Sequence, residues 1–317
     1  MTSETPASTV SVVVPTTGDA PWLAPIVAAA LADGALEVVV VDDRADAARP
    51  ALRLPDDGRV RVLSGPRAGP GPARQAGVEA ARGDVVLLLD HDVVPEPGLV
   101  RGHGARHAAA SALVVVGAMP VVVRPGEPRP RYPRALYAAD YARRAARWSA
   151  DPDDVLEHLW TGNVSLRRAD ALHVGLASAD YRGYRHEDRD FGLRCRAAGL
   201  RGVYAPELRA VHQYERPAER FFADARAQGA EQAQLARLHP EAAVVRRPED
   251  LLDGVPGALR PVLRIAARGP RGAAVLRGVL RGLLAAAGVL RADAAALRLA
   301  QLRRRAEQIG GWTRPGV

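Results

Sequence analysis

The chain has 317 residues, a mass of 33.7 kDa and a formal net charge of +8. Hydrophobic residues make up 48% and charged residues 25%, so the chain can bury a core and is not disordered throughout. All 44 basic residues are arginines, which excludes enzymes that need a Schiff-base lysine or a P-loop lysine. Because a GC-rich genome also enriches arginine and alanine, the pI near 10.4 is weak support for a nucleic-acid partner, and we expect none.

The cysteine content and the terminal segments predict a cytoplasmic protein. Cys195 is the single cysteine and cannot form an internal disulfide. Residues 1–10 lack the basic and apolar regions of a secretory signal. The most apolar stretch, Ala273–Leu290, is interrupted by Arg277 and Arg281, so we expect no membrane-spanning helix.

Residues 1–9 predict a flexible tail, and an alternation of strands and helices follows up to residue 95. Continuous apolar runs, rather than alternating ones, are typical of a parallel sheet covered on both faces. The expected strands are Val10–Val14, Leu36–Val41, Val60–Leu63 and Val85–Leu89, and the expected helices are Trp22–Leu31 and Pro72–Ala81.

Beyond residue 95 the pattern is looser. We expect one sheet domain over residues 10–238, a linker over residues 239–257 and a helical extension over residues 258–317. Within the domain, the expected strands are Leu113–Val116, Val121–Val123, Asn163–Arg167 and Val203–Ala205, the expected loop is Pro125–Pro133, and the expected helices are Glu187–Ala198 and Glu219–Leu238.

Polar residues follow three of the expected strands. A single Asp after a strand is more often a turn or cap residue. Three such ends in one sheet indicate a ligand site, because ligands bind outside the carboxyl ends of strands in open α/β sheets. The three ends are Pro15-Thr16, Asp42-Asp43 and Asp90-His91-Asp92.

The third of these ends has the spacing of a metal site. Asp90 and Asp92 share one face of an extended segment, and His91 points away and is expected to pack. Two carboxylates on one face suit Mg²⁺ or Mn²⁺, which prefer oxygen ligands and keep positions open for phosphate.

A second acidic cluster lies in Gly183–Gly199. Glu187, Asp188 and Asp190 stand at the start of an expected helix. Helix capping explains one or two of these carboxylates, because the helix dipole favours negative charge there.

Six motifs carry a family resemblance through their order in the chain. They are Val12-Val13-Val14-Pro15-Thr16-Thr17, Val41-Asp42-Asp43, Gly69-Pro70-Gly71-Pro72-Ala73-Arg74-Gln75, Val85 to Asp92, Gly162-Asn163-Val164-Ser165-Leu166-Arg167-Arg168, and Glu187-Asp188-Arg189-Asp190-Phe191-Gly192-Leu193-Arg194. In this order they resemble the family 2 glycosyltransferases of the Asp-x-Asp type, and the resemblance covers roughly residues 10–215. Arg44-Ala45 replaces the family's Gly-Ser, Gln75 replaces its Asn, and residues 178–184 lack its Gly-Phe-Asp-Glu, which leaves the donor and acceptor open.

The resemblance implies a GT-A fold of the α/β class, with a mainly parallel central sheet flanked by helices. It also implies a metal-dependent inverting glycosyltransferase that uses Mn²⁺ or Mg²⁺. Such an enzyme moves a sugar from a nucleotide-diphosphate donor to a hydroxyl on a glycan, a lipid-linked molecule or a small molecule. By the same resemblance, the donor is held by Pro15, Thr16, Asp42, Asp43, Arg74 and Asp90, and the metal by Asp92 with Asp90.

The later motifs supply the implied catalytic and acceptor residues. Asp188 is the expected general base, and Glu187 would orient the acceptor. His212 is the positional match for a metal ligand, with a structural role as the alternative. Asn163 has either an acceptor or donor contact or a structural role. Trp160 would stack on the acceptor sugar or pack in the core.

The last 60 residues are rich in Ala, Leu and Arg. The pairs Arg264/Arg268 and Arg277/Arg281 each lie on one helix face. We favour helices that cover the catalytic domain and expose their arginines. The alternative is that residues 258–317 lie on the inner face of an anionic membrane, where a basic amphipathic helix would bind. The oligomeric state stays open.

Other protein classes fit the sequence less well. A sugar nucleotidyltransferase needs a Gly-rich loop with a basic residue after the first strand, where Thr16-Thr17-Gly18-Asp19 stands here. A dinucleotide-binding oxidoreductase needs GxGxxG, which Gly69-Pro70-Gly71 does not complete. A non-enzymatic protein that binds nucleic acid or membrane remains an alternative, although the arginines are scattered and only 4% of residues are aromatic.

Overall fold

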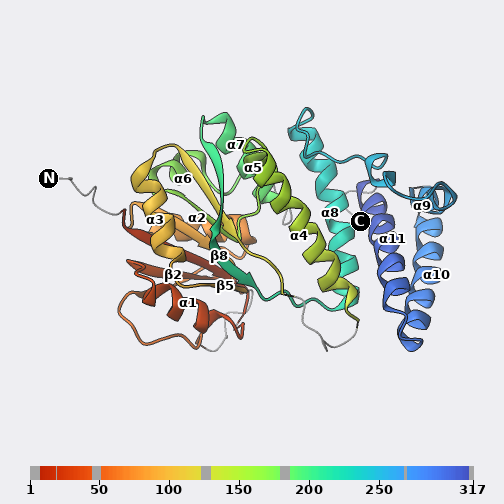
Figure 1. Ribbon diagram of the computed structural model, residues 1–317, viewed down its shortest axis with the longest axis horizontal. Coiled ribbons are helices and arrows are strands. Elements are labelled where there is room, and N and C mark those ends of the chain that lie inside the picture. The colour runs from red at the N-terminus through yellow and green to blue at the C-terminus, as the bar shows by residue number, and fades with distance from the viewer. Residues whose placement is uncertain are drawn as a thin grey trace. The chain divides into compact units, whose positions relative to one another are not determined.

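The computed structural model describes residues 8–18, 20–44, 51–122, 130–178, 186–267 and 270–313. The chain divides into two compact units, which Figure 1 shows. The sheet unit comprises Met1–Val122 and Ala142–Gln213, and the helical unit comprises Val123–Tyr141 and Tyr214–Val317.

One mixed sheet of eight strands organises the sheet unit, with the order β3-β2-β1-β4-β7-β6-β8-β5. The strands β1 to β4 run parallel to one another, as expected, whereas β7 lies antiparallel to both β4 and β6. The strand β8 is parallel to β6 and antiparallel to β5. The bounds are β1 (Val10–Thr16), β2 (Glu37–Asp42), β3 (Val60–Ser64), β4 (Val85–Leu89), β5 (Val93–Pro95), β6 (Leu113–Ala118), β7 (Asn163–Arg167) and β8 (Arg201–His212).

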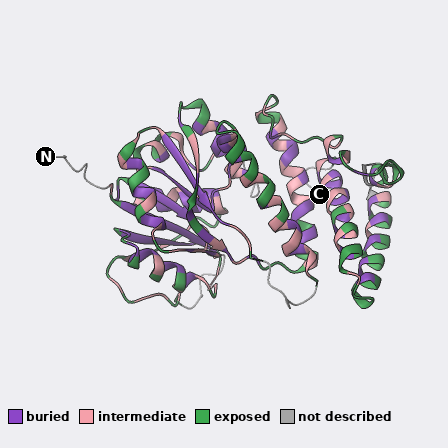
Figure 2. Ribbon diagram, viewed as in Figure 1, coloured by how far each residue is buried: buried purple, intermediate pink, exposed green. Residues whose placement is uncertain are grey.

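The core lies around the valine-rich central strands. Every residue of β1, β2 and β4 is buried, which Figure 2 shows as continuous purple ribbons. Helices α1 (Leu23–Ala32), α2 (Pro70–Ala80) and α3 (Leu99–Ala109) pack against this half of the sheet. A Cβ at Gly77 would lie 2.3 Å from Val13, so this glycine allows α2 to approach β1 closely.

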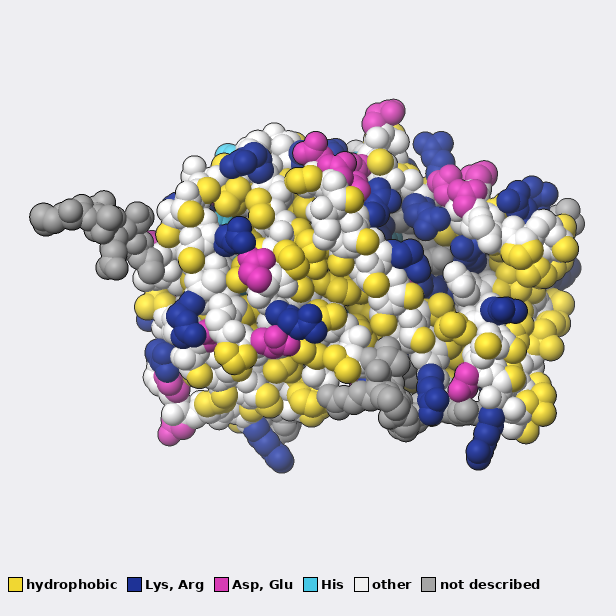
Figure 3. Space-filling model, in the orientation of Figure 1, with side chains coloured by type: hydrophobic (Ala, Val, Ile, Leu, Met, Phe, Trp, Pro, Cys, Tyr) yellow, Lys and Arg dark blue, Asp and Glu magenta, His cyan; other side chains and the backbone are white. Residues whose placement is uncertain are grey.

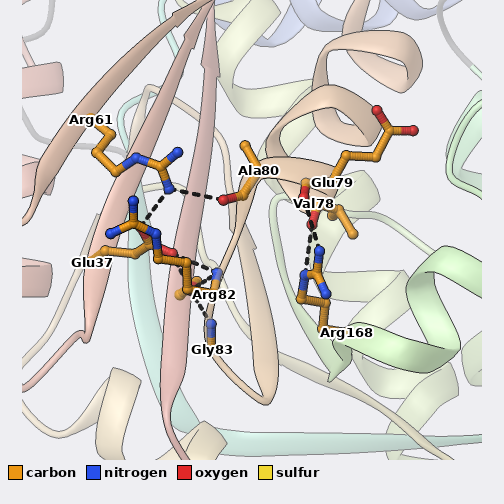
Figure 4. A network of polar contacts seen from close by, with 9 residues as sticks. Glu37, Arg61, Val78, Glu79, Ala80, Arg82, Gly83 and Arg168 are labelled. Carbon is orange, nitrogen blue, oxygen red and sulfur yellow. Dashed lines mark hydrogen bonds and ion pairs between the residues drawn. The ribbon is translucent and has the colours of Figure 1, made fainter.

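Ion pairs and hydrogen bonds connect β2, β3 and the end of α2 where β2 begins (Figure 4). The buried Glu37 pairs with Arg61 at 2.8 Å and accepts the backbone N–H of Arg82 at 2.7 Å. Burial raises the pKa of Glu37, but hydrogen bonds from Arg61 and Ser11 outweigh it and hold the pKa below its usual value. Arg168 donates to two carbonyl oxygens near the end of α2. This network fixes the sheet at the opposite end of β2 from Asp42.

The second half of the sheet unit differs from the prediction. Only Val121 of the expected strand Val121–Val123 forms a bridge, to His212, and residue 123 lies outside the described part. The expected Val203–Ala205 is the middle of the longer β8. Residues 125–129 of the expected loop also lie outside the described part, and residue 132 already begins a helix. The unforeseen helices are α4 (Tyr132–Ala150), α5 (Asp154–Glu157) and α6 (Arg168–Val174), whereas α7 (Glu187–Ala197) was expected.

Long helices build the helical unit. They are α8 (Ala218–Leu238), α9 (Arg260–Ala267), α10 (Pro270–Val289) and α11 (Asp293–Trp312), with short 3-10 turns at Asp250–Leu252 and Gly257–Leu259. Cβ atoms at Gly229 and Gly311 would each lie 1.9 Å from a carbonyl oxygen of the facing helix, so these glycines let α8 and α11 touch backbone to backbone.

The expected domain boundaries therefore need correction. We expected α8 to end the sheet domain, but it packs on α11 in the helical unit. The segment expected to be a linker contributes Leu251 and Val255 to the core of that unit, beside Leu263 and Leu280. Among the described residues, one stretch, Arg271–Val289, is long and apolar enough to cross a membrane by length and composition alone, and 28% of it is buried.

Candidate active site

The carboxyl ends of β1 and β2 bring the first expected site residues together. Thr16 lies directly opposite Asp42 in the parallel register, and Pro15 lies opposite Val41. The Thr16 hydroxyl is held within its own turn by hydrogen bonds with the backbone of Gly18. This edge therefore has the polar character that the strand ends predicted.

Asp42 is neutralised by its near neighbour Arg44. The Nη2 atom of Arg44 lies 2.7 Å from Asp42 Oδ2, and its Nε atom lies 2.9 Å from Oδ1, which makes a bidentate pair. Arg44 stands where the family pattern has glycine, so this chain places a guanidinium at the edge where the resemblance implies that a nucleotide binds.

Asp43 shapes the glycine-rich loop that leads into α2. Its carboxylate accepts the backbone N–H groups of Arg67 and Gly69. Gly69 has φ +97°, which favours glycine, and a Cβ at Gly65 would lie 2.5 Å from Asp43 Oδ1. Asp43 thus holds the loop in addition to lying at the strand end.

Arg74 joins the end of β4 to the start of α7. Its side chain is buried, its Nη2 lies 2.7 Å from Asp90 Oδ1, and its Nη1 lies 3.5 Å from Glu187 Oε1. Burial lowers the pKa of Arg74, but the charges of Asp90, Glu187 and Asp188 raise it further, so the guanidinium stays charged. In this structure Arg74 therefore collects three of the expected site carboxylates around one cation.

Asp92 and His212, two of the expected metal ligands, lie close to one another. His212 Nε2 lies 3.3 Å from Asp92 Oδ2, because β5 pairs antiparallel with β8 and places Val93 opposite His212. The backbone N–H of Gln213 donates to the carbonyl oxygen of Asp92 at 2.7 Å and fixes this corner.

The three-residue metal set is not assembled, however. In the part of the chain that the structure describes, no group of three or more His, Cys, Asp or Glu residues could hold a metal ion. The Asp90 carboxylate is paired with Arg74 instead. The remaining pair, Asp92 and His212, offers a carboxylate oxygen and an imidazole nitrogen, which is a donor set that suits Mn²⁺ and leaves positions open for phosphate oxygens.

Asp188 binds a proton more tightly than an ordinary aspartate. Burial raises its pKa to about 6, although Arg189, Arg144 and Arg74 act to lower it. Its Oδ1 atom accepts the backbone N–H of Arg189 at 2.9 Å. A carboxylate that titrates near neutral pH is suited to general-base work, because it is ionised at pH 7 and still accepts a proton readily.

Arg144 is a site residue that the sequence analysis missed. Its guanidinium lies 4.4 Å from the centre of the Trp160 ring, and its Nη1 donates to the carbonyl oxygen of His158 at 2.7 Å. It also acts on the pKa of Asp188. Trp160 is half-buried under it, so its ring does not belong to the fully buried core. Arg144 belongs to none of the six motifs, and the helix that carries it was not predicted.

Asn163 has a structural position rather than an open one. It has no exposed surface, and its amide donates to carbonyl oxygens of Ala118 and Leu208, at the ends of β6 and within β8. His103 Nε2–H donates to its side-chain oxygen at 3.0 Å. Every polar atom of this side chain is thus occupied inside the sheet, and the acceptor contact expected of Asn163 does not fit this geometry.

The same network contains two buried histidines from α3. Ser165 Oγ lies 2.7 Å from His103 Nδ1 and 2.8 Å from His107 Nε2. Burial lowers the pKa of His103 to about 3 and that of His107 to about 4, so both rings are neutral at pH 7. The i, i+4 spacing of these histidines and the i, i+2 spacing of Asn163 and Ser165 are the signals in the sequence that a shared buried network exists.

The mixed sheet with acidic strand ends at one edge is the GT-A fold of glycosyltransferases. The family model "Glycosyl transferase family 2" matches residues 11–188, which is more than half of the chain. The chain therefore belongs to glycosyl transferase family 2, and its enzyme class is that of the glycosyltransferases.

Similar proteins agree with this assignment. The succinoglycan biosynthesis protein ExoO of Rhizobium meliloti (strain 1021) is 44% identical over 90 residues, which are 27% of this chain and 26% of that protein. The match thus spans about a quarter of this relative.

Two solved structures share the fold. The mannosyltransferase PcManGT from Pyrobaculum calidifontis, in complex with GDP-Man and Mn²⁺, is 18% identical with a TM-score of 0.54, over 94% of this chain and 86% of that chain. GalNAc-T7 with UDP, GalNAc and Mn²⁺ is 15% identical with a TM-score of 0.51, over 77% and 52%. At these identities the likeness concerns the fold alone.

Proposed function

We propose that this protein is a metal-dependent inverting glycosyltransferase that moves a sugar from a nucleotide-diphosphate sugar to a hydroxyl acceptor. The observation that carries the proposal is the arrangement around Arg74, which joins the acidic end of β4 to the start of α7, where Asp188 lies. One buried cation thereby joins the strand end proposed to bind the donor to the helix start that carries Asp188, a carboxylate with a pKa of about 6.

The edge formed by β1 and β2 is the proposed nucleotide site. Pro15, Thr16 and Asp42 lie side by side there, and Asp43 holds the loop before α2. Two proteins of the same fold were solved with a uridine or guanosine diphosphate compound and Mn²⁺, which supports a nucleotide donor here. Because Arg44 neutralises Asp42, we propose that Arg44 also contacts the nucleotide.

Asp92 and His212 are the proposed metal ligands, with Mn²⁺ or Mg²⁺ as the ion. The carboxylate and the imidazole 3.3 Å apart fit a divalent ion that completes its coordination with phosphate oxygens. When bound, such an ion neutralises the diphosphate and helps it to depart. The Asp90 carboxylate, held by Arg74, is then the proposed ribose contact rather than a ligand.

Asp188 is the proposed general base. It takes the proton of the acceptor hydroxyl while that oxygen bonds to the anomeric carbon and the bond from this carbon to the diphosphate breaks. Such a single displacement inverts the anomeric configuration. Glu187, fixed by Arg74, and Trp160, covered by Arg144, are the proposed acceptor contacts.

The acceptor is proposed to be a sugar hydroxyl. The partial match to a succinoglycan biosynthesis protein supports a saccharide-building role, and a half-buried tryptophan suits the apolar face of a sugar ring. A cytoplasmic location stays a prediction.

The test is the release of nucleoside diphosphate from UDP-, GDP- and dTDP-sugars with Mn²⁺, with and without a mixture of sugar acceptors. We expect one donor to be used, and we expect Asp188→Asn to lower the rate about 100-fold or more. Release from no donor, or equal rates for wild type and Asp188→Asn, would contradict the proposal. Arg201→Gln, at an exposed arginine at the start of β8, is the control.

A further inference from the structure

The excess of basic over acidic residues lies almost entirely in one segment of the sequence. Residues 254–292 contain seven arginines and no acidic residue. The rest of the chain has 37 arginines against 36 acidic residues, so it is nearly neutral. Almost the whole net charge of +8 therefore belongs to α9, α10 and the turns beside them.

The helix α10 has one buried seam. Its inner residues recur every three or four positions and pack in the helical unit, where α10 contacts α9 and α11. They are Ala273, Leu276, Leu280, Leu284 and Ala287. This seam attaches the helix to the protein along its whole length.

The outer side of α10 carries a strip of exposed apolar side chains. Val275 is 66% exposed, Val279 54% and Leu283 47%, and the two residues after them at the end of the helix, Val289 and Leu290, are 84% and 77% exposed. The spacing of 275, 279 and 283 places these three side chains on one strip, because residues four apart lie above one another on a helix. Figure 2 shows this outer side as exposed along the length of α10.

The neighbouring helix extends the same kind of surface. Leu259 is 39% exposed and Ile265 is 38% exposed, at the start and in the middle of the α9 region. Arg264 and Arg271 are exposed beside them. Figure 3 shows hydrophobic side chains gathered over the helices that Figure 1 labels α9 and α10.

We propose that the outer face of α9 and α10 binds the surface of a bilayer that contains anionic lipid. The exposed valines and leucines would enter the boundary between headgroups and acyl chains, and the arginines beside them would pair with lipid phosphates. This proposal chooses the alternative that the sequence analysis left open for residues 258–317 and assigns it to one face.

The charge pattern favours a lipid surface over a second copy of the chain. A symmetric dimer through this face would bring the exposed Arg264, Arg271 and Arg281 of each copy opposite the same arginines, and their segment contains no acidic residue to compensate them. The buried seam favours a helix that lies on the membrane over one that spans it. A spanning helix would have to pull Leu276, Leu280 and Leu284 out of the core in which they are packed.

Co-sedimentation of the full chain with vesicles tests this proposal. The vesicles are phosphatidylcholine alone, or phosphatidylcholine with about a quarter phosphatidylglycerol, at low salt. We expect anionic lipid to raise the partition coefficient about tenfold or more. The readout needs neither sugar donor nor acceptor, so it is independent of the proposed glycosyl transfer.

Matched variants separate the two components of the face. Val275→Ser with Val279→Ser should lower the partition several-fold, whereas Val62→Ser, at a valine 52% exposed on β3, should not. Arg264→Gln with Arg271→Gln should lower it about tenfold, whereas Arg82→Gln with Arg201→Gln should change it less than about twofold. All seven positions are exposed, so these variants should fold.

Three results would overturn the proposal. The first is equal partition onto neutral and anionic vesicles, or partition that the α9 and α10 variants do not change. The second is protein that alkaline carbonate does not remove from the vesicles, which would indicate a spanning helix. The third is a dimer in sedimentation velocity that the double valine variant dissociates without any vesicle binding, which would assign the face to a second copy.

Discussion

The Nε2 atom of His212 lies 3.3 Å from the Oδ2 atom of Asp92, although the two residues stand far apart in the sequence. The contact follows from the short strand β5, whose three residues pair with the end of β8 directly after Asp92. An imidazole and a carboxylate so placed offer two metal-ligand atoms, and this pair leads to the first prediction.

Asp92→Asn should weaken Mn²⁺ binding in the presence of a nucleoside diphosphate at least about tenfold, because the amide lacks the charge of the carboxylate. Electron paramagnetic resonance of free Mn²⁺ measures this directly. His91→Gln is the control, since His91 is expected to point away from the metal. If Asp92→Asn binds Mn²⁺ as tightly as wild type, Asp92 is not a ligand.

Asp188→Asn should remove activity and stabilise the fold at alkaline pH. The pKa of Asp188 is raised from 3.8 to about 6, so ionisation costs free energy in the folded state as pH rises from about 4 to above 6. The uncharged amide avoids this cost, and we expect on the order of 2 kcal/mol of added stability at pH 8 and little change near pH 4.

Chemical denaturation of wild type and Asp188→Asn at both pH values measures that difference. Asp151→Asn, at an exposed carboxyl group in the sheet unit, is the control and should change stability by less than about 0.5 kcal/mol. A loss of stability in Asp188→Asn at pH 8 would mean that the charge of Asp188 is favourable where it lies.

Arg144→Gln should raise the pKa of Asp188 further. The guanidinium of Arg144 is one of the charges that lower this pKa against the effect of burial. We expect the acid limb of the pH–rate profile to move upward by roughly half a unit to one unit. Arg143→Gln, at the exposed neighbouring arginine, should leave the limb in place. An unchanged limb in Arg144→Gln would place Arg144 outside the electrostatic field of the base.

Ser165→Ala should destabilise the protein by about 1–3 kcal/mol, because it leaves two buried histidines without their shared partner. Ser149→Ala, at an exposed serine on α4, should cost less than about 0.5 kcal/mol. Urea titrations compare the two. Equal effects would show that the buried network contributes no more than a surface hydroxyl.

The buried histidines also predict acid sensitivity. The pKa values of His103, His107 and His158 are lowered to about 3, 4 and 4, chiefly by burial. In the unfolded chain each of these histidines takes up a proton as the pH falls below about 6.5, whereas in the folded protein they stay neutral until about pH 4. Stability should therefore fall as pH decreases below about 6.5: the histidines contribute a slope of up to about 4 kcal/mol per pH unit, and the raised pKa of Asp188 offsets about a third of it. A flat stability profile between pH 6 and pH 5 would contradict this.

The first half of the sheet was predictable because its strands are short, continuous apolar segments. The runs Val10–Val14 and Val85–Leu89, apolar except for Ser11, favour strands that are buried on both faces, and the structure confirms both. The antiparallel position of β7 was not predictable, because its apolar residues would suit either direction. Helix α4 was missed because proline and arginine before Tyr132 predicted a loop.

The candidate site residues could be named from the strand ends and from the acidic start of α7, and their roles stay predictions. Their contacts could not be predicted. That Arg74 pairs with Asp90 depends on how α2, β4 and α7 pack together. The burial of Asn163 likewise depends on α3, β6 and β8, none of which its motif specifies.

The most direct test of the account is thermal unfolding of the wild-type protein with UDP, GDP and dTDP, each with Mn²⁺ and each with EDTA. The account predicts that one nucleotide stabilises the fold in the presence of Mn²⁺ only, by about 2.7 kcal/mol at 100 times its dissociation constant. It also predicts that Asp92→Asn loses this stabilisation and that His91→Gln keeps it. The absence of any shift with all three nucleotides would contradict a nucleotide-sugar site at this edge of the sheet.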